Sequence, residues 1–335
     1  MLTGIRTALV ATLALAAAPA LSASPVGVRE FTVTAPERAE PIAATIWYPA
    51  GDGGSAEQVG ENKVFQGVPA LRGADVSEGR FPVVLLAHGG LRAAPNQSGW
   101  IAADLASRGA LVVAVPPRRL AGPNEGVAEV WLRPADLTAA LSALEADPAF
   151  GPHAGPAPAS AVGFFLGGTA ALMLAGARID PASYVRSCDV PDPGPDCAWF
   201  GAAGVDLHAV DTTTLVRSSL DQRIGTIVAI DPELTTSLAA DSLAGMVPRV
   251  SVINLGAPGD VAPYLDASGL RAESAAYASI PGATPFSAMA LCQPRGAKIL
   301  AAEGEDDTIC SEDAEERGRV HARLADMIAE ALETR

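Results

Sequence analysis

Residues 161–177 read AVGFFLGGTAALMLAGA, in which two apolar stretches meet at a corner rich in glycine. The first stretch begins two residues before this segment and covers 159–165; it is short and apolar, which favours a buried strand. The second stretch begins at Leu166 and is rich in Ala and Leu, which favours a helix. Because glycine has no Cβ, the glycines of the corner allow strand and helix to approach closely. The segment therefore predicts a strand, a tight turn at Phe165 and a buried helix.

The same alternation of strand and helix patterns continues along the chain. Apolar runs that predict strands are 31–35, 43–49, 81–90, 111–117, 224–230, 249–256 and 275–280. Helix patterns cover 98–110, 134–148 and 311–335, whereas 50–80 predicts a long surface loop and 179–223 shows little regular pattern. We therefore expect the α/β class: a doubly wound, mostly parallel sheet with helices on both faces and an antiparallel start.

Sites in such sheets lie beyond the carboxyl ends of the strands. The segments at those ends include AHGG (87–90), the Phe165 corner, Asp231, Asp260 and the loop that holds Pro285. The corner has the small residues that a nucleophile elbow needs, because there the central residue must project from a strained backbone. The helix after it would direct free N–H groups and its positive dipole end at the space above the corner.

These features resemble the α/β-hydrolase fold, and more narrowly the bacterial dienelactone-hydrolase-like proteins related to platelet-activating-factor acetylhydrolase. The resemblance rests on the corner and on FPVVLLAHGG, RPADLTAAL, AIDPEL and PGATPFSAMALC. It implies a nucleophilic serine where this chain has Phe165, a histidine where it has Pro285, and an acid at Asp231. Asp260 is the second candidate for the acid. The amides of Gly90 and Leu166 would form the oxyanion hole.

Neither substituted residue can perform the chemistry that the resemblance implies. Phenylalanine has no atom that attacks a carbonyl, and the proline side chain accepts no proton. The sequence therefore predicts a pseudoenzyme of the carboxylic-ester or lactone hydrolase type, with neither metal nor cofactor. It would be retained to bind a small acyl, ester or lactone-like ligand, or a protein partner.

The same residues allow three other interpretations. The corner is also typical of simple strand–helix packing, and it matches a phosphate-binding loop poorly. An active hydrolase could use displaced groups, with Ser287 and His88 as candidates. None of the four histidines, His88, His153, His208 and His321, has the sequence context of the family's base. An interaction protein with an acidic surface is the third interpretation.

The ends of the chain and its composition indicate export. Residues 1–24 carry one early cation, an apolar stretch and small residues, which is typical of a secretory signal peptide. We expect a single domain over 25–335, periplasmic or secreted, with no membrane span in the mature form. The net charge of −15 argues against nucleic acid as a partner.

The four cysteines agree with an oxidising compartment. Four cysteines allow three pairings, and proximity favours Cys188–Cys197 and Cys292–Cys310. The first pair would pin an excursion at about 179–223, which either flanks the site or is an ordinary surface loop.

Overall fold

The computed structural model describes residues 24–156, 158–246, 248–273 and 275–333. Except for Ser24, the signal peptide expected over 1–24 lies outside the described residues. Among these residues, no helix is both long and apolar enough to cross a membrane.

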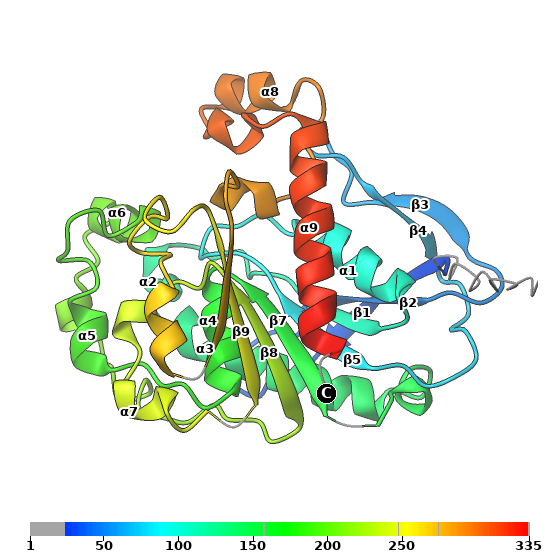
Figure 1. Ribbon diagram of the computed structural model, residues 1–335, viewed down its shortest axis with the longest axis horizontal. Coiled ribbons are helices and arrows are strands. Elements are labelled where there is room, and N and C mark those ends of the chain that lie inside the picture. The colour runs from blue at the N-terminus through cyan, green and yellow to red at the C-terminus, as the bar shows by residue number, and fades with distance from the viewer. Residues whose placement is uncertain (1–23, 157, 247, 274, 334–335) are drawn as a thin grey trace, which may run out of the picture.

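A mixed sheet forms the centre of the molecule (Figure 1). In the described part of the chain it has ten strands, in the order β10-β9-β8-β7-β5-β6-β2-β1-β4-β3. Their bounds are β1 Val26–Val33, β2 Ile42–Pro49, β3 Ser55–Val59, β4 Val68–Arg72, β5 Val83–Ala87, β6 Leu111–Val115, β7 Ala159–Phe164, β8 Ile224–Ile230, β9 Arg249–Leu255 and β10 Ala276–Ile280. From β6 to β10 the strands pair in parallel, whereas β2 is antiparallel to both β1 and β6. The expected antiparallel start and parallel centre are therefore confirmed.

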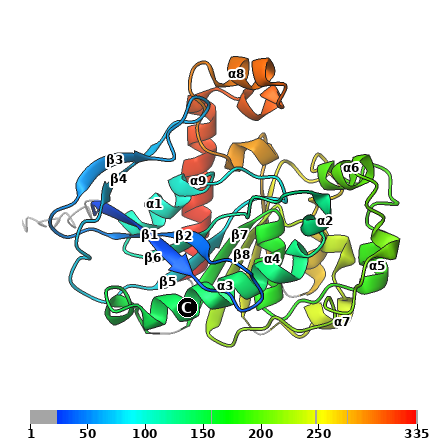
Figure 2. The ribbon, with the colours of Figure 1, turned by 180° about the vertical axis from the view of Figure 1, so that it is seen from behind.

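The central strands are apolar because both of their faces are covered. All five residues of β5, VVLLA, are buried, as a strand between two helical layers requires. On one face lie α1 Gly99–Ser107 and α9 Ala314–Glu333, which contact each other. On the other face lie α3 Glu129–Ala146 and α4 Leu166–Leu174 (Figures 1 and 2).

Two sequence expectations about this framework were wrong. The supposed loop 50–80 contains β3 and β4, which pair with each other and extend the sheet because β4 pairs with β1. Helix α3 starts five residues before the expected boundary at Pro134, which lies inside the helix. Pro134 costs the helix one hydrogen bond, and the packing of the buried face of α3 offsets this loss.

The segment 179–223 is more regular than its sequence suggests. It contains α5 Pro181–Val185 and α6 Pro195–Ala202, each of which begins with a proline at its first turn. The remaining α-helices are α2 Pro123–Gly126, α7 Ala240–Leu243 and α8 Gly296–Glu303.

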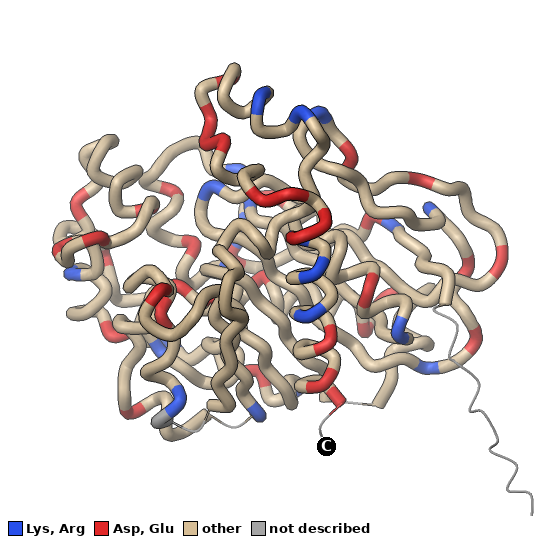
Figure 3. The backbone as a smooth tube through the Cα atoms, turned by 45° about the horizontal axis from the view of Figure 1, so that its top comes forward, with Lys and Arg blue, Asp and Glu red and all other residues tan. Residues whose placement is uncertain are grey.

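Both expected disulfides are confirmed, Cys188–Cys197 and Cys292–Cys310. The first disulfide joins Cys188, which lies before α6, to Cys197 within α6. The second closes a loop that contains α8. Two disulfides fit an extracellular or periplasmic protein. Acidic positions are spread over many backbone segments, with fewer basic ones between them (Figure 3).

Candidate functional site

The corner after β7 has the backbone of a nucleophile elbow. Phe165 has φ +56° and ψ −127°, a conformation that a residue other than glycine adopts only under strain. Its N–H donates to the carbonyl of Ile230 at 3.0 Å, and its carbonyl accepts from the N–H of Thr169 at 3.1 Å. Such a strained turn between strand and helix is how α/β-hydrolases expose their central side chain.

Glycines make this corner sterically feasible. A Cβ on Gly163 would lie 2.1 Å from the carbonyl oxygen of Gly167, and a Cβ on Gly167 would lie 2.4 Å from that of Ala87. Both distances are far below van der Waals contact. The close approach of α4 to β7 and β5 therefore requires glycine at both positions.

The side chain at the centre of the corner is an apolar ring. Phe165 is 7% exposed, and its ring meets that of His88 edge-to-face at 5.7 Å between centroids. Phe164 contacts the same imidazole at 5.0 Å. The position that the resemblance assigns to a nucleophile thus carries a packed aromatic side chain.

Asp231 follows β8 and is completely buried. Its Oδ1 accepts from Asn254 Nδ2 at 2.8 Å and from the N–H of Leu255 at 2.9 Å. Its Oδ2 is buried without a hydrogen-bond partner in the described part of the chain. Burial raises the pKa of Asp231 to about 7, although these two hydrogen bonds oppose the shift. A buried carboxyl oxygen without a donor is costly, and a histidine N–H is the donor it meets in a catalytic triad.

The second candidate acid, Asp260, lies in a different environment. It follows β9 in a loop, and its side chain is exposed. Its N–H donates to the carbonyl of Ala257 at 2.9 Å. The assignment of either aspartate as the acid stays a prediction, and only Asp231 has the buried, hydrogen-bonded carboxyl that orients a catalytic base.

Pro285 opens a 3₁₀ turn over residues 285–288 after β10. In that turn Ser287 is completely buried, accepts from the N–H of Thr284 at 2.9 Å and donates to Glu312. Its hydroxyl is therefore bound to a carboxylate, not to a histidine. The geometry does not favour Ser287 as a displaced nucleophile.

One of the four histidines is buried without a hydrogen-bond partner among the described residues, and the other three contact other groups. His88 is buried with neither ring nitrogen hydrogen-bonded among the described residues, and burial lowers its pKa to about 4. His321 stacks on Trp100 at 3.8 Å, and His208 binds Asp189 at 3.0 Å. His153 contacts the carbonyl of Gly79 through Nδ1, at 2.9 Å.

The loop that contains Gly90 is anchored by a buried ion network that the sequence analysis missed. Arg133 donates to the carbonyl of Gly89 and, at 2.8 Å, to that of Gly90. Glu129 pairs with Arg133 at 3.3 Å and with Arg38 at 2.5 Å. The available signal was the set of charged residues inside the otherwise apolar helix α3.

The N–H groups of Gly90 and Leu166 donate to no backbone carbonyl in the described part of the chain. An oxyanion hole requires N–H groups that can donate to a ligand oxygen. Their assignment to that hole stays a prediction.

A cavity of about 450 Å³ lies beside the corner. Leu166 forms part of its wall, and the excursion contributes both cysteines of the first disulfide and the α6 residue Phe200. Most of the lining is apolar, as in small-molecule sites. Besides four prolines, the lining residues with large apolar or aromatic side chains are Leu91, Val130, Leu166, Tyr184, Val190, Phe200, Leu207, Leu234 and Tyr264.

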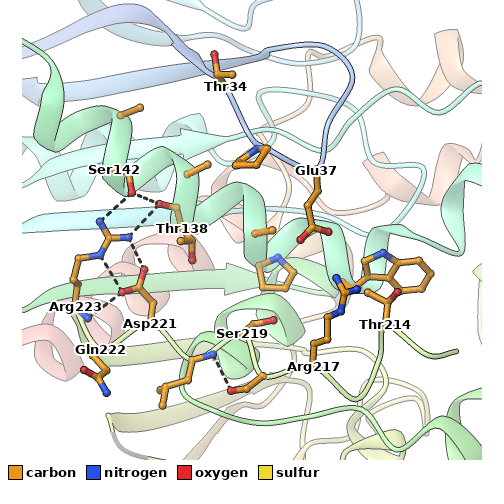
Figure 4. A pocket seen from close by; sticks show the side chains of 18 of the residues that line it. Thr34, Glu37, Thr138, Ser142, Thr214, Arg217, Ser219, Asp221, Gln222 and Arg223 are labelled. Atoms are coloured by element: carbon orange, nitrogen blue, oxygen red, sulfur yellow. Dashed lines mark hydrogen bonds and ion pairs between the residues drawn. The ribbon is translucent and has the colours of Figure 1, made fainter.

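A larger groove of about 960 Å³ lies elsewhere (Figure 4). Its lining includes Asp221 and Arg223, which precede β8 and so lie at the amino end of that strand. Arg223 pairs with Asp221 and with Glu145, both at 2.7 Å. Because sites in parallel sheets lie at the opposite end, the smaller cavity is the candidate functional site.

Comparison with known proteins supports the architecture. No protein-family model and no curated protein matches the chain. Among solved structures, a ferulic acid esterase from Streptomyces cinnamoneus is similar, with a TM-score of 0.53 and 15% identity over 92% of this chain and 90% of that one. With the order of the strands, this likeness establishes that the chain has the α/β-hydrolase fold.

Proposed function

We propose that this protein is a pseudoenzyme of the carboxylic-ester or lactone hydrolase type that binds a small, largely apolar ligand. The observation that carries the proposal is the retained elbow backbone with Phe165 at its centre. The narrower resemblance to dienelactone-hydrolase-like proteins and to relatives of platelet-activating-factor acetylhydrolase supports it. So does the similarity in fold to a solved ferulic acid esterase.

The expected loss of catalysis is large. Removing the nucleophile of a well-studied serine protease lowers turnover by roughly 10⁶, which is about 8 kcal/mol of barrier. Oxyanion donors and binding alone leave about 10³–10⁴ over water. A protein with Phe165 and Pro285 at the two reactive positions retains that background at most.

Ligand binding does not need the missing groups. The cavity of about 450 Å³ falls in the range of roughly 300–1,000 Å³ that small-molecule sites occupy. Its apolar lining would bury a hydrocarbon or aromatic ligand, and the amides of Gly90 and Leu166 would bind a ligand oxygen. We therefore expect a bound acyl, ester or lactone-like compound to remain intact.

The proposal includes export of the protein from the cytoplasm. Two disulfides and the signal-peptide pattern of residues 1–24 support a periplasmic or secreted protein whose single domain covers 25–335. In this compartment the Cys188–Cys197 bond keeps the cavity wall in place.

The test uses the oxidised mature protein with p-nitrophenyl acetate and p-nitrophenyl butyrate. The expected result is hydrolysis no faster than in a solution of an inert protein of the same concentration. Enzyme-like turnover that Ser287→Ala abolishes would replace this proposal with an active hydrolase that uses displaced groups.

A further inference from the structure

The charged side chains that line the cavity beside the corner are all acidic. Among the described residues they are Asp192, Asp196 and Glu233, and the lining contains no Lys, Arg or His. The other lining residues are apolar or uncharged. A cavity of this composition discriminates between ligands by the sign of their charge.

Two of these carboxyl groups converge on one point. A methyl group built on Gly90 would lie 2.9 Å from Glu233 Oε1 and 3.6 Å from Asp196 Oδ2. The two residues come from different elements, since Glu233 follows β8 and Asp196 lies in the first turn of α6. The fold, and not a local motif, brings them together.

The backbone of Glu233 is tied to the corner. Its N–H donates to the carbonyl of Phe165 at 3.4 Å, and its carbonyl accepts from Thr169 Oγ1 at 2.5 Å. The carboxyl group is thus held at the end of the cavity where the oxyanion-hole amides are expected.

Of these two carboxyl groups, only Asp196 forms an ion pair among the described residues, with Arg92. Arg133 binds Glu129 and the carbonyls of Gly89 and Gly90. Arg92 Nε lies 3.7 Å from Asp196 Oδ1, and its side chain is half exposed. The amino end of α4 supplies about half a positive charge.

The pKa values of these two carboxyl groups agree with an excess of negative charge at this point of the cavity. Burial, with the nearby Asp196, raises the pKa of Glu233 to about 8, and burial also raises the pKa of Asp196. At neutral pH the pair therefore holds a proton. A bound cation would replace it, because a desolvated cation interacts strongly with two carboxylates.

The walls of the cavity suit an organic cation. Tyr184, Phe200 and Tyr264 present aromatic side chains to it, and ring faces attract cations. Leu166 and Leu207 supply aliphatic surface. Together these walls would bury the hydrocarbon part of a ligand whose charged end reaches the acidic pair.

We propose that the cavity binds an apolar organic amine in its cationic form, with the ammonium group between Glu233 and Asp196. This inference deepens the proposed function and depends on it, because it assigns a ligand class to the same cavity. It narrows the expected ligand to one that carries a cationic amine.

The test is isothermal titration calorimetry at pH 7 with three probes that share an aromatic body. These are 2-phenylethylamine, 2-phenylethanol and 3-phenylpropanoate, which are cationic, neutral and anionic. A charge-assisted hydrogen bond contributes about 1.5–3 kcal/mol, so the amine should bind roughly ten- to a hundredfold more tightly than the alcohol.

Glu233→Gln and Asp196→Asn should each remove most of that preference while the affinity for the alcohol changes little. Glu303→Gln is the matched control, since Glu303 is exposed on α8, and it should keep the preference. Circular dichroism of each variant confirms that the fold is retained.

Equal affinity for the three probes, or tightest binding of the anion, would overturn the inference and leave the proposed ligand-binding function standing. An amine preference that survives Glu233→Gln with Asp196→Asn would also overturn it. No binding of any probe at millimolar concentration would refute both the inference and ligand binding at this cavity.

Discussion

Installing the two missing groups should create an esterase. The change is Phe165→Ser together with Pro285→His. The strained backbone at 165 already has the geometry of an elbow, and Asp231 Oδ2 is buried with no donor among the described residues. An imidazole N–H that reaches Asp231 would satisfy that oxygen and complete a triad.

The magnitude follows from the parts present. A complete triad contributes about 10⁶ in turnover, and a misplacement of about 1 Å costs roughly 10². We therefore expect the double variant to exceed each single variant by about 10²–10⁴. Each single variant should stay at background, since triad residues act as a unit.

The change also destabilises the fold. Phe165 is buried, and removing a buried ring costs roughly 3–5 kcal/mol. Thermal unfolding by circular dichroism must show that the double variant is folded at the assay temperature.

The assay is initial-rate hydrolysis of p-nitrophenyl acetate, combined with mass analysis of a fluorophosphonate adduct. Phe165→Ala with Pro285→His is the control, because it leaves the same cavity without the hydroxyl. A folded double variant that forms no adduct and hydrolyses no faster than this control would show that the corner and Asp231 do not support a triad.

Three further predictions concern stability. Gly163→Ala should lower the free energy of unfolding by more than about 1–3 kcal/mol, because the new Cβ would lie 2.1 Å from a carbonyl oxygen. In α9, a Cβ on Gly318 would have no atom within 4 Å, so Gly318→Ala should raise the free energy of unfolding by roughly 0.5–1 kcal/mol. Urea denaturation measures both changes. Replacing Cys292 and Cys310 with serine should cost roughly 3 kcal/mol by the same method, and an unchanged midpoint would contradict this. The pKa of Asp231 is raised to about 7, so its protonation stabilises the folded state at low pH, and this contribution is lost as pH rises from about 4 to above 7. The free energy of unfolding of Asp231→Asn, relative to that of the wild type, should therefore increase between pH 5 and pH 8. A constant difference between the two proteins would contradict this.

The cavity also makes a prediction about binding and pH. The affinity for benzyltrimethylammonium, whose charge is fixed, should rise as pH increases from 6 to 9, because Glu233 loses its proton around pH 8. Asp196, Arg133 and Tyr264 also act on this carboxyl. A flat profile by calorimetry would contradict the exchange of proton for cation.

The sequence was sufficient where burial imposes a simple pattern. The continuous apolar run of β5 and the glycine corner before α4 could be recognised because a strand between two layers has no polar face. The pair β3 and β4 was missed, since β3, SAEQV, is short and mostly exposed and so has neither a continuous apolar run nor strict alternation. Helix α5 was missed although Asp180 caps it, because a segment of five residues is too short to show a helical period.

The site divides in the same way. Phe165, Pro285 and Asp231 could be singled out because each stands in a short motif. The convergence of Glu233 and Asp196 could not, since 37 positions separate them and only tertiary packing sets their distance. The contact of Arg133 with the loop carbonyls has the same origin.

The loss of a serine nucleophile is tested most directly by intact-mass analysis of the oxidised mature protein after incubation with a fluorophosphonate probe. We expect an unmodified mass under conditions in which an active serine hydrolase is fully labelled. A stoichiometric adduct on any serine would contradict it.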